Sequence, residues 1–128
     1  PDGVIVELIG PAHTLVAPPV SASELQRAAR DLADAATRIN RNQVMVEVPS
    51  LGPSDNAYLA DTLRLAQLGI DRANRRALRD LQSIRVQTGA RPDAVYSGGT
   101  LEITIAAGRG YAGRPSSEFI RRALDRGR

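Results

Sequence analysis

An amphipathic pattern over residues 21–40, followed at once by an alternating pattern over residues 43–48, constrains the fold most. Apolar residues at helical spacing predict that the first segment is a helix with one buried face, which Ser21 or Ser23 can cap. The alternation in "QVMVEV" predicts that a strand follows. Residues 3–10, "GVIVELIG", are rich in Val and Ile and predict another strand. The first fifty residues are therefore expected to form a β-α-β unit with parallel strands and a right-handed crossover.

The middle of the chain allows two interpretations. Residues 55–68 contain a single β-branched residue, which favours a helix. The apolar period continues across Gly69 as far as Leu81, so the first interpretation is one helix that runs on through residues 70–86. The alternative makes residues 62–68, "TLRLAQL", a strand, followed by a helix over residues 71–86. Helix propensity favours the first interpretation, because leucine-rich strands without Val or Ile are unusual.

The last third of the chain predicts a hairpin and a closing helix. In "AVYSGGTLEITIAAG", Gly98 and Gly99 lie between two segments of strand character. "RPSSEFIRRALD" predicts a short helix that Ser116 or Ser117 can cap. Its apolar residues are expected to pack on the sheet, and they are Phe119, Ile120, Ala123 and Leu124. The expected fold class is therefore α/β, or more broadly α+β: β-α-β units form a small sheet with helices packed on one face.

The composition narrows the possible chemistry. Residues 1–128 are expected to form a single domain. The chain has no cysteine, which excludes disulfides, thiolate catalysis and cysteine-based zinc sites, and His13 is its only histidine, so no metal site is predicted. No apolar run approaches the roughly 18 residues that a membrane span needs. No signal-peptide pattern is present. We therefore expect a cytoplasmic protein with no membrane partner.

The charges are unevenly distributed along the chain. All 17 basic residues are arginine, and the formal net charge is +3. Residues 1–63 hold 4 Arg against 8 acidic residues, whereas residues 64–128 hold 13 Arg against 6. The positive second half predicts an anionic partner: a carboxylate substrate, a phosphate backbone or an acidic neighbouring subunit.

Pro1 is the first candidate for catalysis. A proline at a free amino terminus carries a secondary amine, and an apolar pocket beside arginines lowers the pKa of such an amine towards neutrality. A neutral amine can take a proton from the carbon next to a carbonyl, or attack the carbonyl itself. Arginine can hold the carboxylate of the substrate by paired hydrogen bonds.

Three segments carry a resemblance to a known family. Pro1, "ELQRAARDLADAATRINRNQVMVEV" and "LGIDRANRRALRDLQSIRVQTGARPDAVY" together resemble the tautomerase superfamily. The resemblance implies two β-α-β units, with residues 62–68 as a strand, and a trimer or hexamer in which an amino-terminal proline is the catalytic acid or base. It implies Pro1 as the catalytic residue and no cofactor. The substrate, a small keto or unsaturated carboxylic acid, would be bound by Arg72, Arg75, Arg76 and Tyr96.

Two further resemblances give alternative functions. "SIRV", "TLEITIAAGRGYA" and "RPSSEFIRRALD" resemble the tail-completion (neck) proteins of tailed bacteriophages, which implies a non-enzymatic, virion-associated subunit of a ring. Under this alternative, arginines meet acidic residues of a neighbouring subunit, such as Asp31 or Asp34. The closing helix also resembles the second helix of ribbon-helix-helix proteins, which makes a basic nucleic-acid-binding module the third hypothesis. The loop "GRGYAG" lacks the spacing of a phosphate-binding fingerprint and is expected to be a flexible turn.

Overall fold

The described chain consists of three α-helices, four short strands and two 3-10 helices. The structure is a computed structural model that describes residues 19–40, 42–106 and 108–127. Its elements are, in order, α2 (Ala22–Asn40), β1 (Met45–Glu47), α3 (Pro53–Arg72), the 3-10 helix η2 (Ala77–Asp80), β2 (Ser83–Gly89), β3 (Asp93–Ser97), β4 (Thr100–Ala106), the 3-10 helix η3 (Gly110–Gly113) and α4 (Ser117–Arg126).

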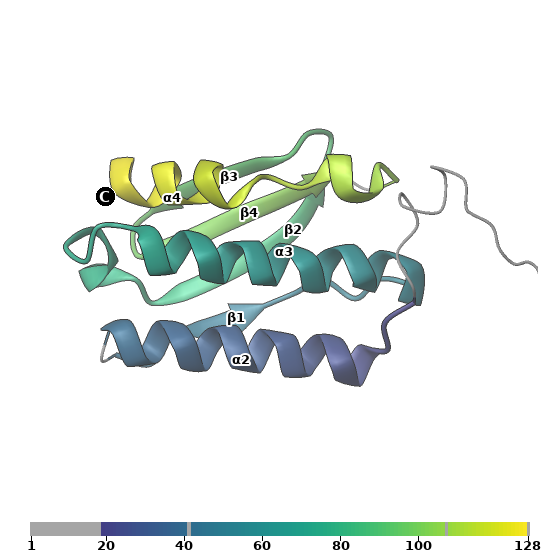
Figure 1. The fold of residues 1–128 in the computed structure, drawn as a ribbon, viewed down its shortest axis with the longest axis horizontal. Helices are drawn as coiled ribbons and strands as arrows, with labels where there is room; N and C mark the ends of the chain where they lie inside the picture. Colours follow the sequence, from purple (N-terminus) through teal and green to yellow (C-terminus); the bar gives the residue numbers. More distant parts are fainter. Residues whose placement is uncertain (1–18, 41, 107, 128) are drawn as a thin grey trace, which may run out of the picture.

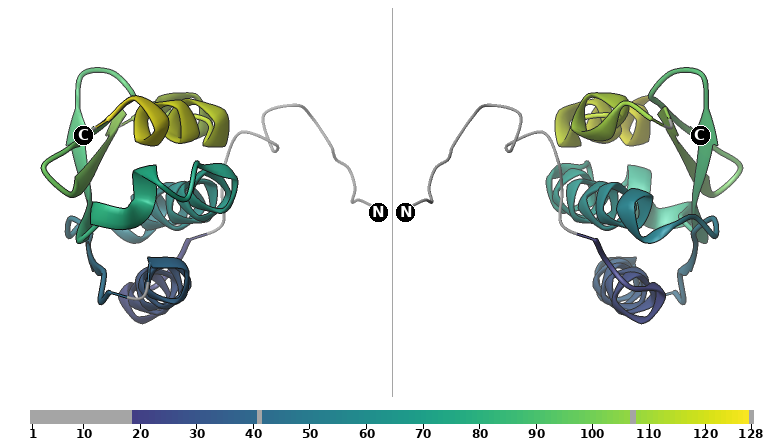
Figure 2. Two further views of the ribbon diagram at one scale, coloured as in Figure 1. Left: turned by 90° about the vertical axis from the view of Figure 1, so that its left-hand side faces the viewer. Right: turned by 90° about the vertical axis from the view of Figure 1, so that its right-hand side faces the viewer.

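The strands form a sheet in the order β1-β2-β4-β3. β1, β2 and β4 are parallel, and β3 pairs with β4 in the antiparallel direction. The helices α2, α3 and α4 lie side by side on one face of this sheet (Figures 1 and 2). The expected fold class is confirmed: a small α+β sheet with helices on one face, a C-terminal hairpin and a short closing helix.

The buried side chains come from the inner face of each element. From the sheet they include Ile84, Leu101 and Ile103, which alternate with exposed positions, as strand geometry requires. From the helices they are Leu25, Ala29, Leu32 and Ala36 of α2, Leu59, Leu63, Ala66 and Ile70 of α3, and Ile120, Ala123 and Leu124 of α4. These residues form one cluster. Phe119 was expected to join them, but 41% of it is exposed, because it lies on the outer side of α4.

Two of the predicted helix caps are confirmed. The Ser21 hydroxyl accepts a hydrogen bond from the Glu24 backbone N–H, while the Glu24 carboxylate accepts one from the Ser21 N–H. This reciprocal pair is a capping box, and its hydrogen bonds lower the pKa of Glu24. At the start of α4, the Ser116 hydroxyl accepts from the Phe119 N–H. Both serines thus satisfy backbone donors that the first helical turn leaves without a partner.

In the middle of the chain, the predicted helix is confirmed, but its predicted end is wrong. Residues 55–68 are helical, so the strand over residues 62–68 that the tautomerase resemblance implies is not formed. The helix does not continue to Leu81, however, because it ends at Arg72. The next residue, Ala73, is extended, and the Asn74 N–H donates to the Asp125 carboxylate of α4 at 2.9 Å. A tertiary contact therefore interrupts a local pattern that would otherwise continue.

The strand β2 was not predicted. Both interpretations of the sequence had placed the start of "SIRVQTG" at the end of a helix, yet Ser83–Gly89 is a strand between β1 and β4. The β-α-β unit that the structure describes is consequently β1-α3-β2. The first predicted strand, over residues 3–10, lies outside the described residues. The hairpin is confirmed, and Gly98 and Gly99 adopt the positive φ angles (59° and 83°) that its turn requires.

Candidate functional site

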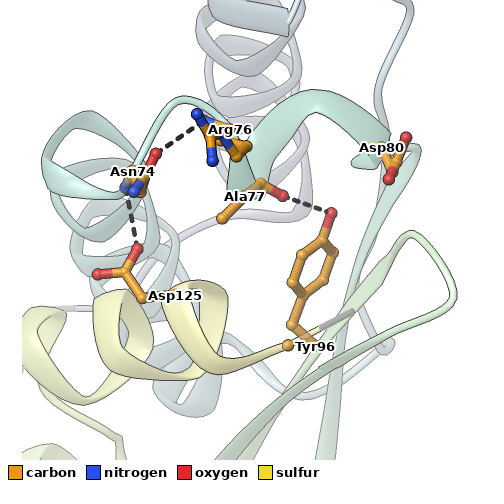
Figure 3. Close-up of a pocket in the computed structure, with 7 residues that line it drawn as sticks. Asn74, Arg76, Ala77, Asp80, Tyr96 and Asp125 are labelled. Atoms are coloured by element: carbon orange, nitrogen blue, oxygen red, sulfur yellow. Dashed lines mark hydrogen bonds between the residues drawn. The ribbon is translucent and has the colours of Figure 1, made fainter.

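A pocket of about 340 Å³ lies where the carboxyl ends of α3 and α4 approach the sheet (Figure 3). It is lined by Asn74, Arg76, Ala77, Asp80, Tyr96, Asp125 and Gly127. These residues come from the α3–β2 connection, from β3 and from the end of α4. The pocket is therefore formed by segments that are distant in sequence.

Hydrogen bonds to the backbone fix the shape of this pocket. The Asn74 side-chain oxygen accepts from the Arg76 N–H at 2.9 Å, which makes the tight turn that leads into η2. The Asp125 carboxylate accepts both from the Asn74 N–H and from the Arg121 guanidinium, the latter at 2.6 Å. The α3–η2 turn is thus held against the last turn of α4.

Tyr96 forms the floor of the pocket. It is 5% exposed, and its hydroxyl donates to the Ala77 carbonyl at 3.0 Å. Burial, with a smaller contribution from the Asp80 charge, raises the pKa of Tyr96 above its ordinary value. The phenol is therefore neutral at physiological pH, and its proton is already bound to a backbone carbonyl. In this arrangement Tyr96 joins β3 to η2 and does not serve as a base.

The structure brings together only some of the predicted substrate-binding residues. Arg76 and Tyr96 line the same pocket. Arg75 donates to the Ile70 carbonyl at 3.3 Å, so it caps the end of α3. Arg72 is exposed in the last turn of α3 and is not among the residues that line the pocket. Pro1, the predicted catalytic residue, lies outside the described residues.

The charges of the pocket do not favour a small carboxylate. Among the residues that the structure describes, Arg76 is the one cation that lines it, against the carboxylates of Asp80 and Asp125. A carboxylate that paired with Arg76 would approach two like charges. Sequence reasoning missed Asn74, Asp80 and Asp125, because no local pattern indicates that residues 74 and 125 meet. Among the described residues, no group of three potential metal ligands comes together, and no helix is long and apolar enough to cross a membrane.

The second surface of interest is the outer face of the sheet, opposite the helices; we call it the open face. Strand register arranges its side chains in three rows across the strands. The rows are Met45, Ser83, Thr100 and Ser97; then Glu47, Arg85, Glu102 and Val95; then Gln87, Thr104 and Asp93. Figure 2 shows that no described helix covers this face. Met45 and Val95 are 57% and 49% exposed on it.

The open face is acidic, and its central row is linked by ion pairs. Arg85 contacts Glu47 at 3.1 Å and Glu102 at 3.6 Å. The other two rows are each linked across β2 and β4 by a hydrogen bond, from Gln87 to Thr104 and between the hydroxyls of Ser83 and Thr100. Three acidic residues, the third being Asp93, accompany one arginine, so the formal charge of the face is −2.

The third surface is the arginine-rich end, which we define as residues 71–80. Its four arginines and two aspartates, all exposed, give it a formal charge of +2; they are Arg72, Arg75, Arg76, Arg79, Asp71 and Asp80. Figure 1 explains this location: α2, α3 and α4 run in the same direction, so their carboxyl ends gather here. Cations are favoured where helix dipoles present their negative ends. The arginines at this end therefore stabilise the helices whose carboxyl ends they flank.

Comparison with known proteins yields one family. The family described as "Domain of unknown function (DUF4908)" matches residues 1–124, which is nearly the whole chain. No curated protein and no solved structure matches the chain.

Proposed function

The chain belongs to the DUF4908 family, whose description assigns no function, and we propose from its structure that it is a non-enzymatic subunit of a homo-oligomeric assembly. The observation that carries the proposal is the open face. Sheets whose strands are mostly parallel are usually covered on both faces, whereas this one has helices on one face. A second copy of the chain is the simplest cover for the other face.

Charge complementarity supports a contact between two different surfaces. The open face carries a formal charge of −2, and the arginine-rich end carries +2. The two surfaces point in different directions, so the end of one copy can meet the open face of the next. A repeated contact of this kind is heterologous and generates a ring or a filament.

The open face fits this role better than the acids suggested by the sequence. Asp31 and Asp34 are exposed on α2, but α2 holds three arginines and three acidic residues, so that helix is neutral overall. The open face has the acidic excess, and it presents exposed Met45 and Val95 beside its charges. Apolar side chains within a charged surface are typical of interfaces between subunits.

The geometry of the pocket supports an enzyme less well. The catalytic function expected for Pro1 stays a prediction, since that residue lies outside the described part of the chain. The tautomerase resemblance implied a second β-α-β unit that began with a strand at residues 62–68. These residues belong to the helix α3. Among the described residues that line the pocket, Tyr96 already donates a hydrogen bond to the backbone, and the two aspartates outnumber Arg76.

Sedimentation of the full chain at several concentrations tests the proposal. We expect self-association at low salt that weakens as salt rises, because exposed charges are screened. The Arg76→Gln and Arg79→Gln double variant should weaken self-association by about tenfold, the effect of roughly 1.4 kcal/mol from two exposed ion pairs. The Glu47→Gln and Glu102→Gln double variant should do the same from the opposite surface.

A matched control separates this contact from a general effect of charge. Arg27 and Arg30 are exposed on α2, away from both surfaces, and their double change to Gln removes the same charge. Self-association of this control should equal that of the parent protein. If the parent chain stays monomeric at its highest soluble concentration in low salt, the proposal is overturned.

A further inference from the structure

A groove of about 560 Å³ runs along the free edge of the sheet, between α2 and β1. α2 contributes one wall, from Gln26 to Thr37, and residues 43–46 contribute the other. In Figure 1, α2 lies beyond β1 and forms the last of the row of elements on that side. A helix that connects two parallel strands normally packs over both of them. α2 therefore occupies the position expected of a helix over β1 and a further strand.

The backbone of β1 has unused hydrogen-bonding capacity along this groove. The Met45 N–H donates to the Gln82 carbonyl, so residue 45 faces β2. Because successive residues of a strand point their N–H and C=O groups to opposite sides, the Val46 groups face the groove. β1 is the last strand of the sheet described, so they have no strand partner within it. An edge of this kind is a template for another strand.

A buried acceptor marks one end of the groove. Asn56 of α3 is 4% exposed, and its side-chain N–H donates to the Val20 carbonyl at 3.2 Å. Its side-chain oxygen is buried with no hydrogen-bond partner among the described residues. Asn56 lines a cavity of about 90 Å³ together with Val48, the residue after β1, and Ala22 at the start of α2. A buried unpaired oxygen costs free energy, so a donor is expected beside it.

We propose that the β1 edge binds residues 4–9 of the same chain, "VIVELI", as a fifth strand parallel to β1. The segment has the Val and Ile content of a strand, and it lies outside the described residues. The described chain begins at Pro19, directly before α2 and beside the cavity of Asn56. A strand parallel to β1 would end at this same end of the sheet. The connecting residues then pass Asn56, where one of their N–H groups can donate to its free oxygen.

The hand of the crossover and the length of the connecting residues both agree with a strand at the β1 edge. The unit β1-α3-β2 moves from the edge inward with its helix on one face of the sheet. A strand outside β1, followed by α2 on that same face, repeats the same hand, as parallel crossovers require. Residues 10–18 span up to about 30 Å when extended, far more than a turn between neighbouring elements needs. The inference stands independently of the proposed assembly.

Hydrogen exchange at the Val46 amide in the full chain tests the proposal by NMR. We expect this amide to be protected, although it faces away from β2. Val6→Pro should remove strand hydrogen bonds from the added segment and raise the exchange rate at Val46 by about tenfold or more. The matched control is Thr14→Pro, which lies beyond the proposed strand and should leave Val46 protected. The amide of Ile103 in β4 should stay protected in both variants, which shows that each one folds.

Two outcomes would overturn the proposal. One is rapid exchange at Val46 in the parent chain while Ile103 is protected. The other is protection of Val46 in an oligomer but not in a dilute monomer, because the strand would then come from a second copy. Either outcome leaves the contact between the open face and the arginine-rich end to be judged by sedimentation.

Discussion

At the scale of single residues, Tyr96 illustrates how one polar atom can connect distant segments. Its ring belongs to the core, while its hydroxyl reaches the Ala77 carbonyl in the α3–β2 connection. Gly127 packs so closely on it that a Cβ there would lie 2.6 Å from the Tyr96 Cβ. The position therefore favours glycine, which lets the end of α4 rest on β3.

Tyr96→Phe should destabilise the protein by about 1 kcal/mol, because it removes one hydrogen bond and leaves the Ala77 carbonyl without its donor. The loss should also depend on pH. The pKa of Tyr96 is higher in the folded state than in the unfolded state, so its contribution is complete below the unfolded pKa of about 10 and is lost as pH rises through the folded pKa.

Urea unfolding of the parent and of Tyr96→Phe between neutral pH and pH 11 measures both effects. The free energy of unfolding of the parent should fall more steeply above pH 10 than that of the variant. Tyr58 and Tyr111 are present in both proteins, so the comparison isolates the effect of Tyr96. Parallel curves would show that Tyr96 titrates alike in the folded and unfolded states.

At the scale of elements, the contact between α3 and α4 depends on Gly69. A Cβ at this position would lie 3.0 Å from the Ile120 Cγ2 atom and 3.0 Å from the Ser117 carbonyl oxygen. The two helices can approach this closely because glycine has no side chain at this position. Glycine in a helix normally costs about 1 kcal/mol relative to alanine, and here the cost is offset by close packing.

Gly69→Val should therefore destabilise the fold by about 2–3 kcal/mol, since a branched side chain forces α4 away from α3. Gly52 provides the control, because a Cβ added there has no atom within 4 Å and its φ is −74°. Gly52→Ala should change the free energy of unfolding by roughly 0.5 kcal/mol or less. Thermal or urea unfolding of the two variants measures the difference, and equal stabilities would contradict the close packing at Gly69.

Local periodicity predicted the elements that local interactions fix. The helix α2, the helical part of residues 55–68 and the hairpin around Gly98 all follow from spacing and turn chemistry. β2 could not be predicted this way, because the break before it depends on Asp125, which lies 51 residues from Asn74. Most of the residues that line the pocket could not be predicted for the same reason. Arg76 and Tyr96 were chosen from a resemblance, whereas Asn74, Asp80 and Asp125 meet only through the tertiary fold.

At the scale of the whole molecule, the common direction of the helices explains where the charges lie. The uneven charge was visible in the sequence as an arginine-rich second half, but its location was not. The fold brings Arg38, Arg72 and Arg126, each in the last turn of a helix, to the same end. Glu24, Asp55 and Glu118 lie in the first turns, at the other end. Each charge suits its own helix dipole.

The strand order also sets the sequence in which the sheet can form. β3 and β4 are joined by a turn at Gly98 and Gly99, whereas Ser83 and Thr100 are 17 residues apart and Glu47 and Arg85 are 38 apart. Closing a longer loop costs more chain entropy, so the hairpin should form first, β2 should join it next, and β1 should pair last. Stopped-flow kinetics should then show that Val95→Ala, which alters a cross-strand pair inside the hairpin, mainly slows folding, while Val46→Ala mainly speeds unfolding. On the nascent chain, β1 therefore waits for its partner β2, and pairing between unfinished copies at the side of β1 that β2 later covers is a risk during synthesis.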